Sequence, residues 1–145
     1  MDVRITTVLE NKLKSAGFDS DLFVQSFKDW KQGDEFSSYF FGKDGTYSSP
    51  PVNGEPYTLC HVHLVPIVDQ SSLHRWKLDW KNKSRKTSDR VLVYVKNHNS
   101  YLLITILPEP GSHQIARMQT PQDKDLMRRF AIIAEAFIDR NDVIA

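Results

Sequence analysis

Two histidines stand one residue apart in the segment TLCHVHLVPI. The segment is rich in residues typical of β-strands, and a strand turns residues i and i+2 to the same side. His61 and His63 therefore share one face, while Cys60, Val62 and Leu64 share the other. Imidazoles titrate near neutral pH, so the pair suits proton transfer in a transition state.

The same pair could bind a metal ion, and a catalytic zinc site would need a third ligand. His74, His113 and Asp89 are candidates, but none stands at a spacing typical of a metal-binding motif. The pair can also be two solvent-facing histidines on a half-exposed strand. The histidine pattern alone does not choose between these roles.

A basic stretch follows the histidines, from Arg75 to Arg90. Seven of its residues are Lys or Arg and two are Asp. Trp76 and Trp80 lie within it, and basic residues interleaved with aromatics favour single-stranded nucleic acid, because bases stack on rings and cations meet phosphates. Alternatively, one tryptophan covers the core while the charges face solvent.

A third candidate is the loop PEPGSHQIAR, which carries His113 and Arg117. Functional residues are often placed on loops that a rigid scaffold holds. Other catalytic signatures are missing: the chain has no phosphate-binding P-loop, no dinucleotide fingerprint and no nucleophile elbow. Cys60 lies in an apolar strand face and is expected to be inert.

Length and composition fit one domain that spans residues 1–145. A single cysteine rules out an intrachain disulfide and a cysteine-based metal site. The N-terminal residues contain no apolar run typical of a signal peptide or a membrane span, which predicts a cytoplasmic protein. The net charge is only +1, so any attraction to nucleic acid must come from local clusters.

The elements that must position these residues follow from periodicity and turn signals. Val3–Val8 is a candidate strand, and two helices follow at Leu9–Ala16 and from Asp19 or Ser20 to Gly33. Phe36–Pro56 is rich in Gly, Pro and Ser and is expected to be a long loop.

The later elements are a strand at Tyr57–Val65, a hairpin of Arg90–Lys96 and Tyr101–Leu107, and an amphipathic helix at Pro121–Arg140. This order predicts an α+β fold. A small, mainly antiparallel sheet of about four strands would pack with an N-terminal αα-hairpin and a C-terminal helix. We expect the helices on one side and the other face open to solvent or a ligand.

Several motifs in order carry a family resemblance: FFGKDGTY, HVHL, SRKTSD, LVYV, YLLITILPEP with HQIAR, and IAEAF. Together they resemble the YafO family of type II toxin–antitoxin toxins, over roughly Asp29 to Phe137. The resemblance implies a RelE-like fold and a ribosome-dependent endoribonuclease that cleaves mRNA and stops translation. It also implies a YafN-like antitoxin as partner and no cofactor.

The implied reaction is metal-independent acid–base cleavage, in which the ribose 2′-hydroxyl attacks the phosphate. The catalytic candidates are His61, His63, Arg85, Asp89 and His113. His63 and His113 would transfer protons, Arg85 would stabilise the charged phosphate, and Asp89 would orient a histidine or hold Arg85. Which histidine is the base and which the acid stays open.

RNA-binding candidates are the basic and aromatic residues Lys77, Trp80, Lys81, Lys83, Lys86 and Arg117. An alternative function needs these residues but no histidine: a non-catalytic module that binds RNA or the ribosome and inhibits translation by occlusion. A metal-dependent hydrolase built on His61 and His63 is a further alternative.

Overall fold

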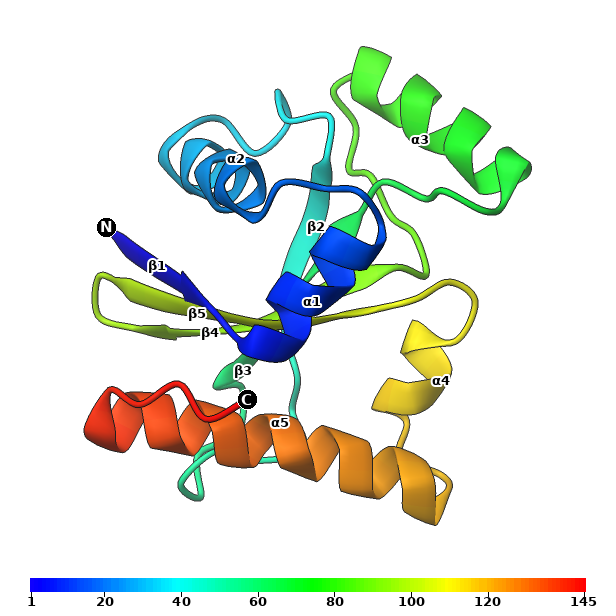
Figure 1. Ribbon diagram of the computed structural model, residues 1–145. Helices are drawn as coiled ribbons and strands as arrows, with labels where there is room; N and C mark the ends of the chain where they lie inside the picture. Colours follow the sequence, from blue (N-terminus) through cyan, green and yellow to red (C-terminus); the bar gives the residue numbers. More distant parts are fainter.

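The predicted hairpin forms the centre of the sheet in a computed structural model that describes residues 1–145 (Figure 1). Its strands are β4, Val91–Asn97, and β5, Ser100–Leu107. The turn between them consists of His98 and Asn99, and His98 has a φ of 56°. A left-handed residue in a two-residue turn matches the twist of the flanking strands.

Three further strands complete a sheet in the order β1-β5-β4-β3-β2. The histidine strand β3, Leu59–Leu64, pairs antiparallel with β4, and β2, Phe41–Thr46, pairs antiparallel with β3. The strand β1, Asp2–Ile5, pairs parallel with β5. The predicted α+β class and mainly antiparallel sheet are confirmed, with five strands instead of about four.

The extra strand is β2, which lies within the segment predicted to be a long loop. Its letters FGKDGT contain two glycines and two charged residues, so the segment has little strand character of its own. Pairing with β3 supplies the missing stabilisation, and a register irregularity between Phe41 and Asp44 accommodates the segment at the sheet edge.

The predicted αα-hairpin and C-terminal helix are present as α1, Thr7–Ser15, α2, Ser20–Gln32, and α5, Pro121–Arg140. Each begins after a side chain that accepts a backbone N–H of the first turn: Thr6, Asp19 and Thr120. The Thr6 cap starts α1 two residues before the predicted Leu9.

Helices cover both faces of the sheet, so the expectation of one open face was wrong. Figure 1 shows α1 and α2 on one side and α5 on the other. The cause lies in β4 and β5, whose side chains are apolar on both faces and nearly all buried. Strands of this kind require a covering layer on each side.

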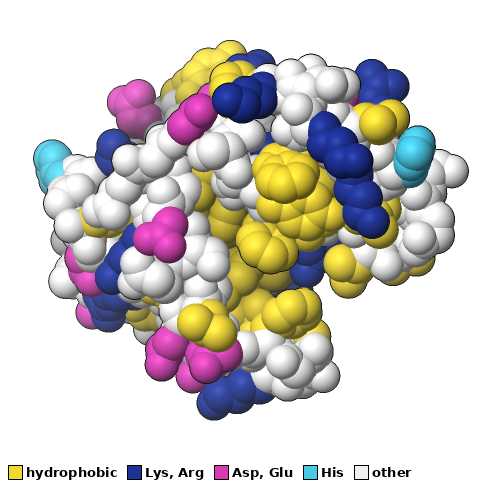
Figure 2. Space-filling view, turned by 90° about the horizontal axis from the view of Figure 1, so that it is seen from above, with side chains coloured by type: hydrophobic (Ala, Val, Ile, Leu, Met, Phe, Trp, Pro, Cys, Tyr) yellow, Lys and Arg dark blue, Asp and Glu magenta, His cyan; other side chains and the backbone are white.

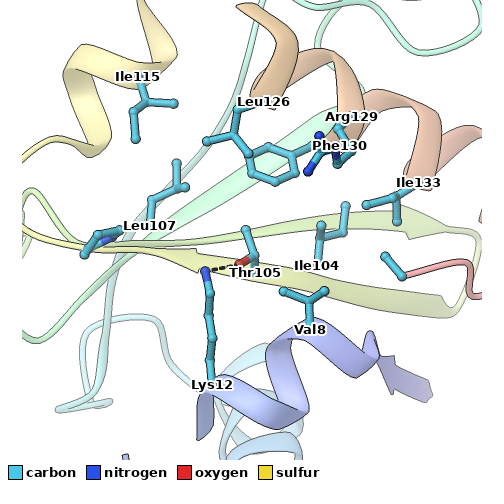
Figure 3. A pocket seen from close by; sticks show the side chains of 12 residues that line it. Val8, Lys12, Ile104, Thr105, Leu107, Ile115, Leu126, Arg129, Phe130 and Ile133 are labelled. Atoms are coloured by element: carbon cyan, nitrogen blue, oxygen red, sulfur yellow. Dashed lines mark hydrogen bonds between the residues drawn. The ribbon is translucent and has the colours of Figure 1, made fainter. Parts of the chain in front are cut away.

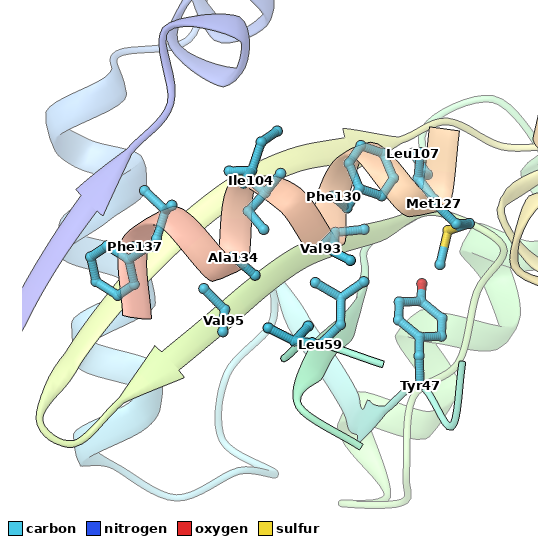
Figure 4. Close-up of a cluster of buried hydrophobic side chains, with 14 of the residues drawn as sticks. Tyr47, Leu59, Val93, Val95, Ile104, Leu107, Met127, Phe130, Ala134 and Phe137 are labelled. Atoms are coloured by element: carbon cyan, nitrogen blue, oxygen red, sulfur yellow. The ribbon is translucent and has the colours of Figure 1, made fainter. Parts of the chain in front are cut away.

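The two faces carry separate hydrophobic cores. On the α5 side, Val93, Val95 and Ile104 pack against Phe130 and Phe137 (Figure 4). The opposite core is formed by residues of α1, α2 and the other sheet face, among them Leu9, Phe27, Trp30, Val62, Leu92 and Leu103.

Two further helices were not predicted. Helix α3, Gln70–Lys81, follows the capping residue Asp69 and is anchored by Trp76, which is fully buried and donates its indole N–H to Tyr39 O at 2.7 Å. Helix α4, Ser112–Ala116, is a short helix within the PEPGSHQIAR loop. No helix combines the length and the apolar character that a membrane span requires.

Candidate active site

Strand β3 divides its side chains as the sequence predicted. Cys60, Val62 and Leu64 belong to the core beneath α1 and α2, and His61 and His63 lie on the α5 side. These histidines do not lie on an open face, however. His63 is only 5% exposed and His61 is half-buried, so loops and α4 cover this part of the sheet.

His61 stacks on Tyr47, with 4.3 Å between the ring centroids. Its Nδ1 atom is buried and has no hydrogen-bond partner. Burial, with the neighbouring His63 as a second cause, lowers the pKa of His61 from 6.5 to about 4. His61 is therefore neutral at pH 7, and a fixed charge at this position is disfavoured.

His63 is held by the backbone of Ser88. Its Nδ1 atom lies 2.6 Å from Ser88 O and 2.9 Å from Ser88 N. With the proton on Nδ1, His63 donates to the carbonyl and leaves Nε2 free to accept a proton. With the proton on Nε2, Nδ1 accepts from the Ser88 N–H. Burial lowers the pKa of His63, and both neutral tautomers have a backbone partner.

Asp89 holds His113 on α4. The Asp89 carboxylate accepts four hydrogen bonds: from Gly111 N at 2.6 Å, Ser112 Oγ at 2.7 Å, His113 N at 2.9 Å and His113 Nδ1 at 2.7 Å. Burial acts to raise the pKa of Asp89, but these bonds outweigh it and hold the pKa at about 2. An ionised carboxylate therefore fixes Nδ1–H of His113 and leaves its Nε2 free.

The three histidines form a row. The ring centroids of His61 and His63 are 6.0 Å apart, and those of His63 and His113 are 5.6 Å apart. Only His113 at the end of the row is exposed. The structure thus brings together four of the five predicted catalytic residues, with Ser88 and Asp89 as consecutive supports of His63 and His113. We call His61, His63, His113 and Asp89 the histidine row.

Two neighbours were not predicted. Lys43 lies close enough that its charge helps to lower the pKa of both His61 and His63. Tyr47 forms the stacking wall behind His61. Both stand in FFGKDGTY, so a correct prediction of strand β2 would have placed them beside β3.

Arg85 does not contact the histidine row. Its side chain is 57% exposed, and Nη2 lies 3.9 Å from Glu35 Oε1. Asp89 thus orients His113 and does not hold Arg85. Because the Arg85 ion pair is long and exposed, it restrains this side chain weakly.

Lys86 is the clearest departure among the predicted RNA-binding residues. It is 1% exposed, and its ammonium lies 5.8 Å from the centroid of the Trp76 ring. Burial lowers its pKa. Lys86 supports the attachment of α3 to the sheet, and this burial argues against direct contact with RNA.

The remaining basic candidates lie on two separate surfaces. Lys77, Lys81 and Lys83 are exposed along and just after α3. Trp80 on the same helix packs edge-on against Tyr39, with 5.1 Å between the ring centroids, and its indole N–H donates to Ser37 O at 3.3 Å. Part of the Trp80 side chain is therefore used for packing within the protein.

Arg117 ends α4 and lines a cleft of about 690 Å³ with two cations that were not predicted, Lys124 and Arg128. The one acidic side chain in its wall, Glu135, already accepts a hydrogen bond from Asn53 N. This basic cleft lies between α5 and the Ser49–Pro51 segment. Its three cations all follow His113 along the chain, and its wall holds one carboxylate.

Two other features bear on the choice of site. No group of three or more His, Cys, Asp or Glu side chains is arranged to hold a metal ion. A pocket of about 220 Å³ lies between α1, α4 and α5 (Figure 3). Its lining is mostly apolar, and Lys12 uses its ammonium to donate to Thr105 Oγ1 at 2.7 Å, so the pocket lacks an acid–base pair.

Comparison with protein families gives a match over most of the chain. The family model described as "Toxin YafO, type II toxin-antitoxin system" matches residues 28–139, which include every member of the histidine row and the basic cleft. Comparisons with curated proteins and with solved structures found no match. The chain therefore belongs to the YafO toxin family of type II toxin–antitoxin systems.

Proposed function

We propose that this toxin is a ribosome-dependent endoribonuclease that cleaves mRNA and thereby stops translation. The observation that carries the proposal is the histidine row, in which an ionised Asp89 orients His113 at 5.6 Å from the neutral ring of His63. Two histidines at this separation can serve the two sides of one phosphodiester. The proposed partners of the toxin are mRNA, the ribosome and a YafN-like antitoxin. The proposed place of its action is therefore the cytoplasm.

The reaction we propose is transesterification. A base removes the proton of a ribose 2′-hydroxyl, the 2′-oxygen attacks the adjacent phosphorus, and the bond to the 5′-oxygen of the next nucleotide breaks. An acid gives its proton to that leaving oxygen. The products are a 2′,3′-cyclic phosphate and a free 5′-hydroxyl, so no metal-bound water and no cofactor is required.

His63 is the proposed base, because burial keeps its imidazole neutral and Ser88 O can hold the proton on Nδ1 while Nε2 accepts. His113 is the proposed acid. It is the one histidine in the row with a carboxylate partner, and it presents Nε2 at the exposed end. His61 takes the role of a neutral spacer that fixes the position of His63.

Positive charge must stabilise the phosphorane that forms during attack. Lys43 is the proposed source of this charge, because its ammonium helps to lower the pKa of both His61 and His63. Arg117 and the basic cleft are proposed to hold the RNA backbone beyond His113. Arg85, weakly paired with Glu35, remains a proposed phosphate contact that would act once RNA is in place.

The burial of His63 supports dependence on the ribosome. His63 is 5% exposed, so a scissile phosphate can reach it only if the covering segment moves or the RNA is presented in a defined conformation. Free RNA pays the full entropic cost of that positioning, whereas the ribosome holds mRNA already ordered.

A non-catalytic inhibitor is the second candidate, favoured by one observation. The exposed cations Lys77, Lys81 and Lys83 belong to or directly follow α3 and do not take part in the histidine row. A basic helix of this kind could dock on ribosomal RNA and block translation without any histidine.

Primer extension on mRNA from a cell-free translation reaction separates the two candidates. We expect discrete new 5′ ends with the wild-type protein, and none with a His61→Ala, His63→Ala, His113→Ala triple variant that folds normally. Translation arrest with intact messages would support occlusion. Equal cleavage of naked RNA without ribosomes would refute the ribosome-dependent part of the proposal. Loss of cleavage in a zinc-selective chelator that leaves Mg²⁺ in solution would favour metal-dependent hydrolysis.

A further inference from the structure

An apolar groove lies on the α1 and α2 side of the molecule, away from the histidine row. Figure 2 looks onto this side and shows hydrophobic side chains gathered in a central hollow. The groove has a volume of about 310 Å³, and nine of its twelve lining residues are hydrophobic. Its floor includes Phe23, Phe41 and Leu64.

The walls of this groove expose large apolar side chains from three different segments. Phe18 is 54% exposed, Leu22 is 67% exposed, and Phe40 and Ile67 are each 57% exposed. Val68, beside Ile67 along the chain, is 65% exposed. Singly exposed apolar residues are ordinary, but a cluster around one hollow marks a surface that a partner covers.

Arg90 adds a charge requirement to this surface. It lines the groove and donates from Nη1 to Val65 O at 3.1 Å, and it forms no ion pair within the chain. Glu109 is the carboxylate that acts on Arg90 electrostatically, and its Oε1 already accepts from the backbone N–H groups of Ile67 and Val68. A guanidinium at the edge of an apolar groove can therefore bind a carboxylate of a partner protein.

We propose that this groove is the docking site for the antitoxin, through an amphipathic helix that carries large apolar residues on one face and a carboxylate placed to meet Arg90. A toxin of a type II system has a protein partner, and apolar anchors with one charged contact are typical of helix-in-groove recognition. The inference rests on the toxin role and extends it by assigning the surface for neutralisation.

The groove is also connected to the histidine row by short segments of chain. Three consecutive residues make this connection. Ser88 holds His63, Asp89 holds His113, and Arg90 lines the groove. Glu109, four residues before His113, binds the backbone of Ile67 at the groove wall. An antitoxin in the groove would therefore contact the segments that hold both proposed catalytic histidines.

The test measures binding and toxicity separately. The probe is the product of the reading frame adjacent to the toxin gene, purified apart from the full toxin chain and titrated against it by calorimetry. Leu22→Ser and Ile67→Ser change the groove lining in two different segments, and Ile144→Ser is the matched control because Ile144 is 48% exposed outside the groove.

We expect each groove variant to bind the probe about tenfold or more weakly, the control to bind normally, and all three to arrest translation as the wild type does. Arg90→Gln should weaken binding and reduce its salt dependence. Normal probe binding by both groove variants would overturn the proposal.

The oligomeric state and the cleavage assay give two further outcomes. A wild-type dimer that Leu22→Ser converts to a monomer, with probe binding unchanged, would assign the groove to a second copy of the chain and overturn the proposal. If the toxin does not cleave mRNA, the proposed function fails, but the loss of probe binding by groove variants still decides the docking site.

Discussion

Asp89 is the residue on which the geometry of the histidine row most depends. Its carboxylate joins the end of the basic stretch to α4 through Gly111, Ser112 and His113. No helical or strand pairing connects these two segments. The carboxylate therefore acts both as the orienting partner of a proposed acid and as the anchor of the loop that carries it.

Asp89→Asn should lower the rate of mRNA cleavage roughly 100-fold. An amide has one acceptor oxygen, so it cannot satisfy all four donors and cannot fix the His113 tautomer as an ionised carboxylate does. Cleavage is measured by primer extension and folding by circular dichroism. Asp125→Asn on the exposed start of α5 is the control. Wild-type cleavage by Asp89→Asn would remove His113 from the proposed mechanism.

The shifted pKa of His61 should make the free energy of unfolding depend on pH. Its pKa is about 4 in the folded protein and near 6.5 when unfolded, so the unfolded state binds the proton more readily. The stabilisation is complete above pH 6.5 and is lost as the pH falls toward 4. Wild-type protein should lose roughly 1 kcal/mol from this group at pH 5, a figure reduced for partial solvent screening.

His61→Phe should keep the stacking on Tyr47 and remove that loss, because phenylalanine has no proton to bind and no unpaired Nδ1. Urea unfolding at pH 7 and pH 5 measures the effect, with the exposed His74→Phe as control. If His61→Phe and wild type lose equal stability between these pH values, the conclusion that folded His61 is neutral is wrong.

At the scale of elements, strand β2 and helix α3 depend on each other. Gly42 in β2 lies against the Lys86 carbonyl oxygen and the ring of Trp76, and Lys43 N donates to that same oxygen at 2.8 Å. The fully buried Trp76 thereby fastens α3 to an edge strand that has little strand propensity of its own.

Gly42→Ala should destabilise the protein by about 1–3 kcal/mol, because the added methyl group would overlap the Lys86 carbonyl and lie 2.8 Å from Trp76 Cη2. Gly45→Ala on the same strand is the matched control, since its methyl group would make an ordinary 3.4 Å contact with His61. Urea unfolding gives both free energies. Equal losses in the two variants would show that the α3 attachment tolerates the extra volume.

Most elements were predictable, and the failures share a cause. The hairpin and α5 carry strong periodicity and clear turn or capping residues, so local chemistry decides them. Strand β2 and helix α3 have weak local patterns, and their pairing with β3 and the burial of Trp76 decide them. The covering of both sheet faces does have a sequence signal, in the continuous apolar runs of β4 and β5.

At the scale of the whole molecule, positive and negative charges nearly cancel, but the positive charges gather on particular surfaces. The net charge is +1, yet the basic cleft and the exposed lysines of α3 present positive charge on different surfaces. Local fields of this kind attract polyanions even when the total charge is near zero. We expect the α3 surface to contribute to ribosome association and the basic cleft to hold mRNA near the histidine row.

A Lys77→Gln, Lys81→Gln, Lys83→Gln variant should weaken ribosome association and reduce the slope of log affinity against log salt by up to about 3. The reason is that binding releases about one counterion fewer from the RNA for each lysine that no longer contacts a phosphate. Lys14→Gln, Lys28→Gln, Arg140→Gln makes the same change in net charge elsewhere. Co-sedimentation across a salt series measures the effect, and identical slopes for both triple variants would exclude a specific role for α3.

The sequence by itself determined the candidate chemistry of the site and the order of the main elements. Alternation along a strand is a local property, so the shared face of His61 and His63 could be identified without a structure. His113 could be identified as a candidate because it stands on a Pro- and Gly-rich loop after the hairpin. Only the tertiary structure decided which candidates meet: Asp89 reaches His113 through a loop contact, and Lys86 turns inward beneath α3. Contacts between segments distant in sequence leave no periodic signal, and burial is set by those contacts.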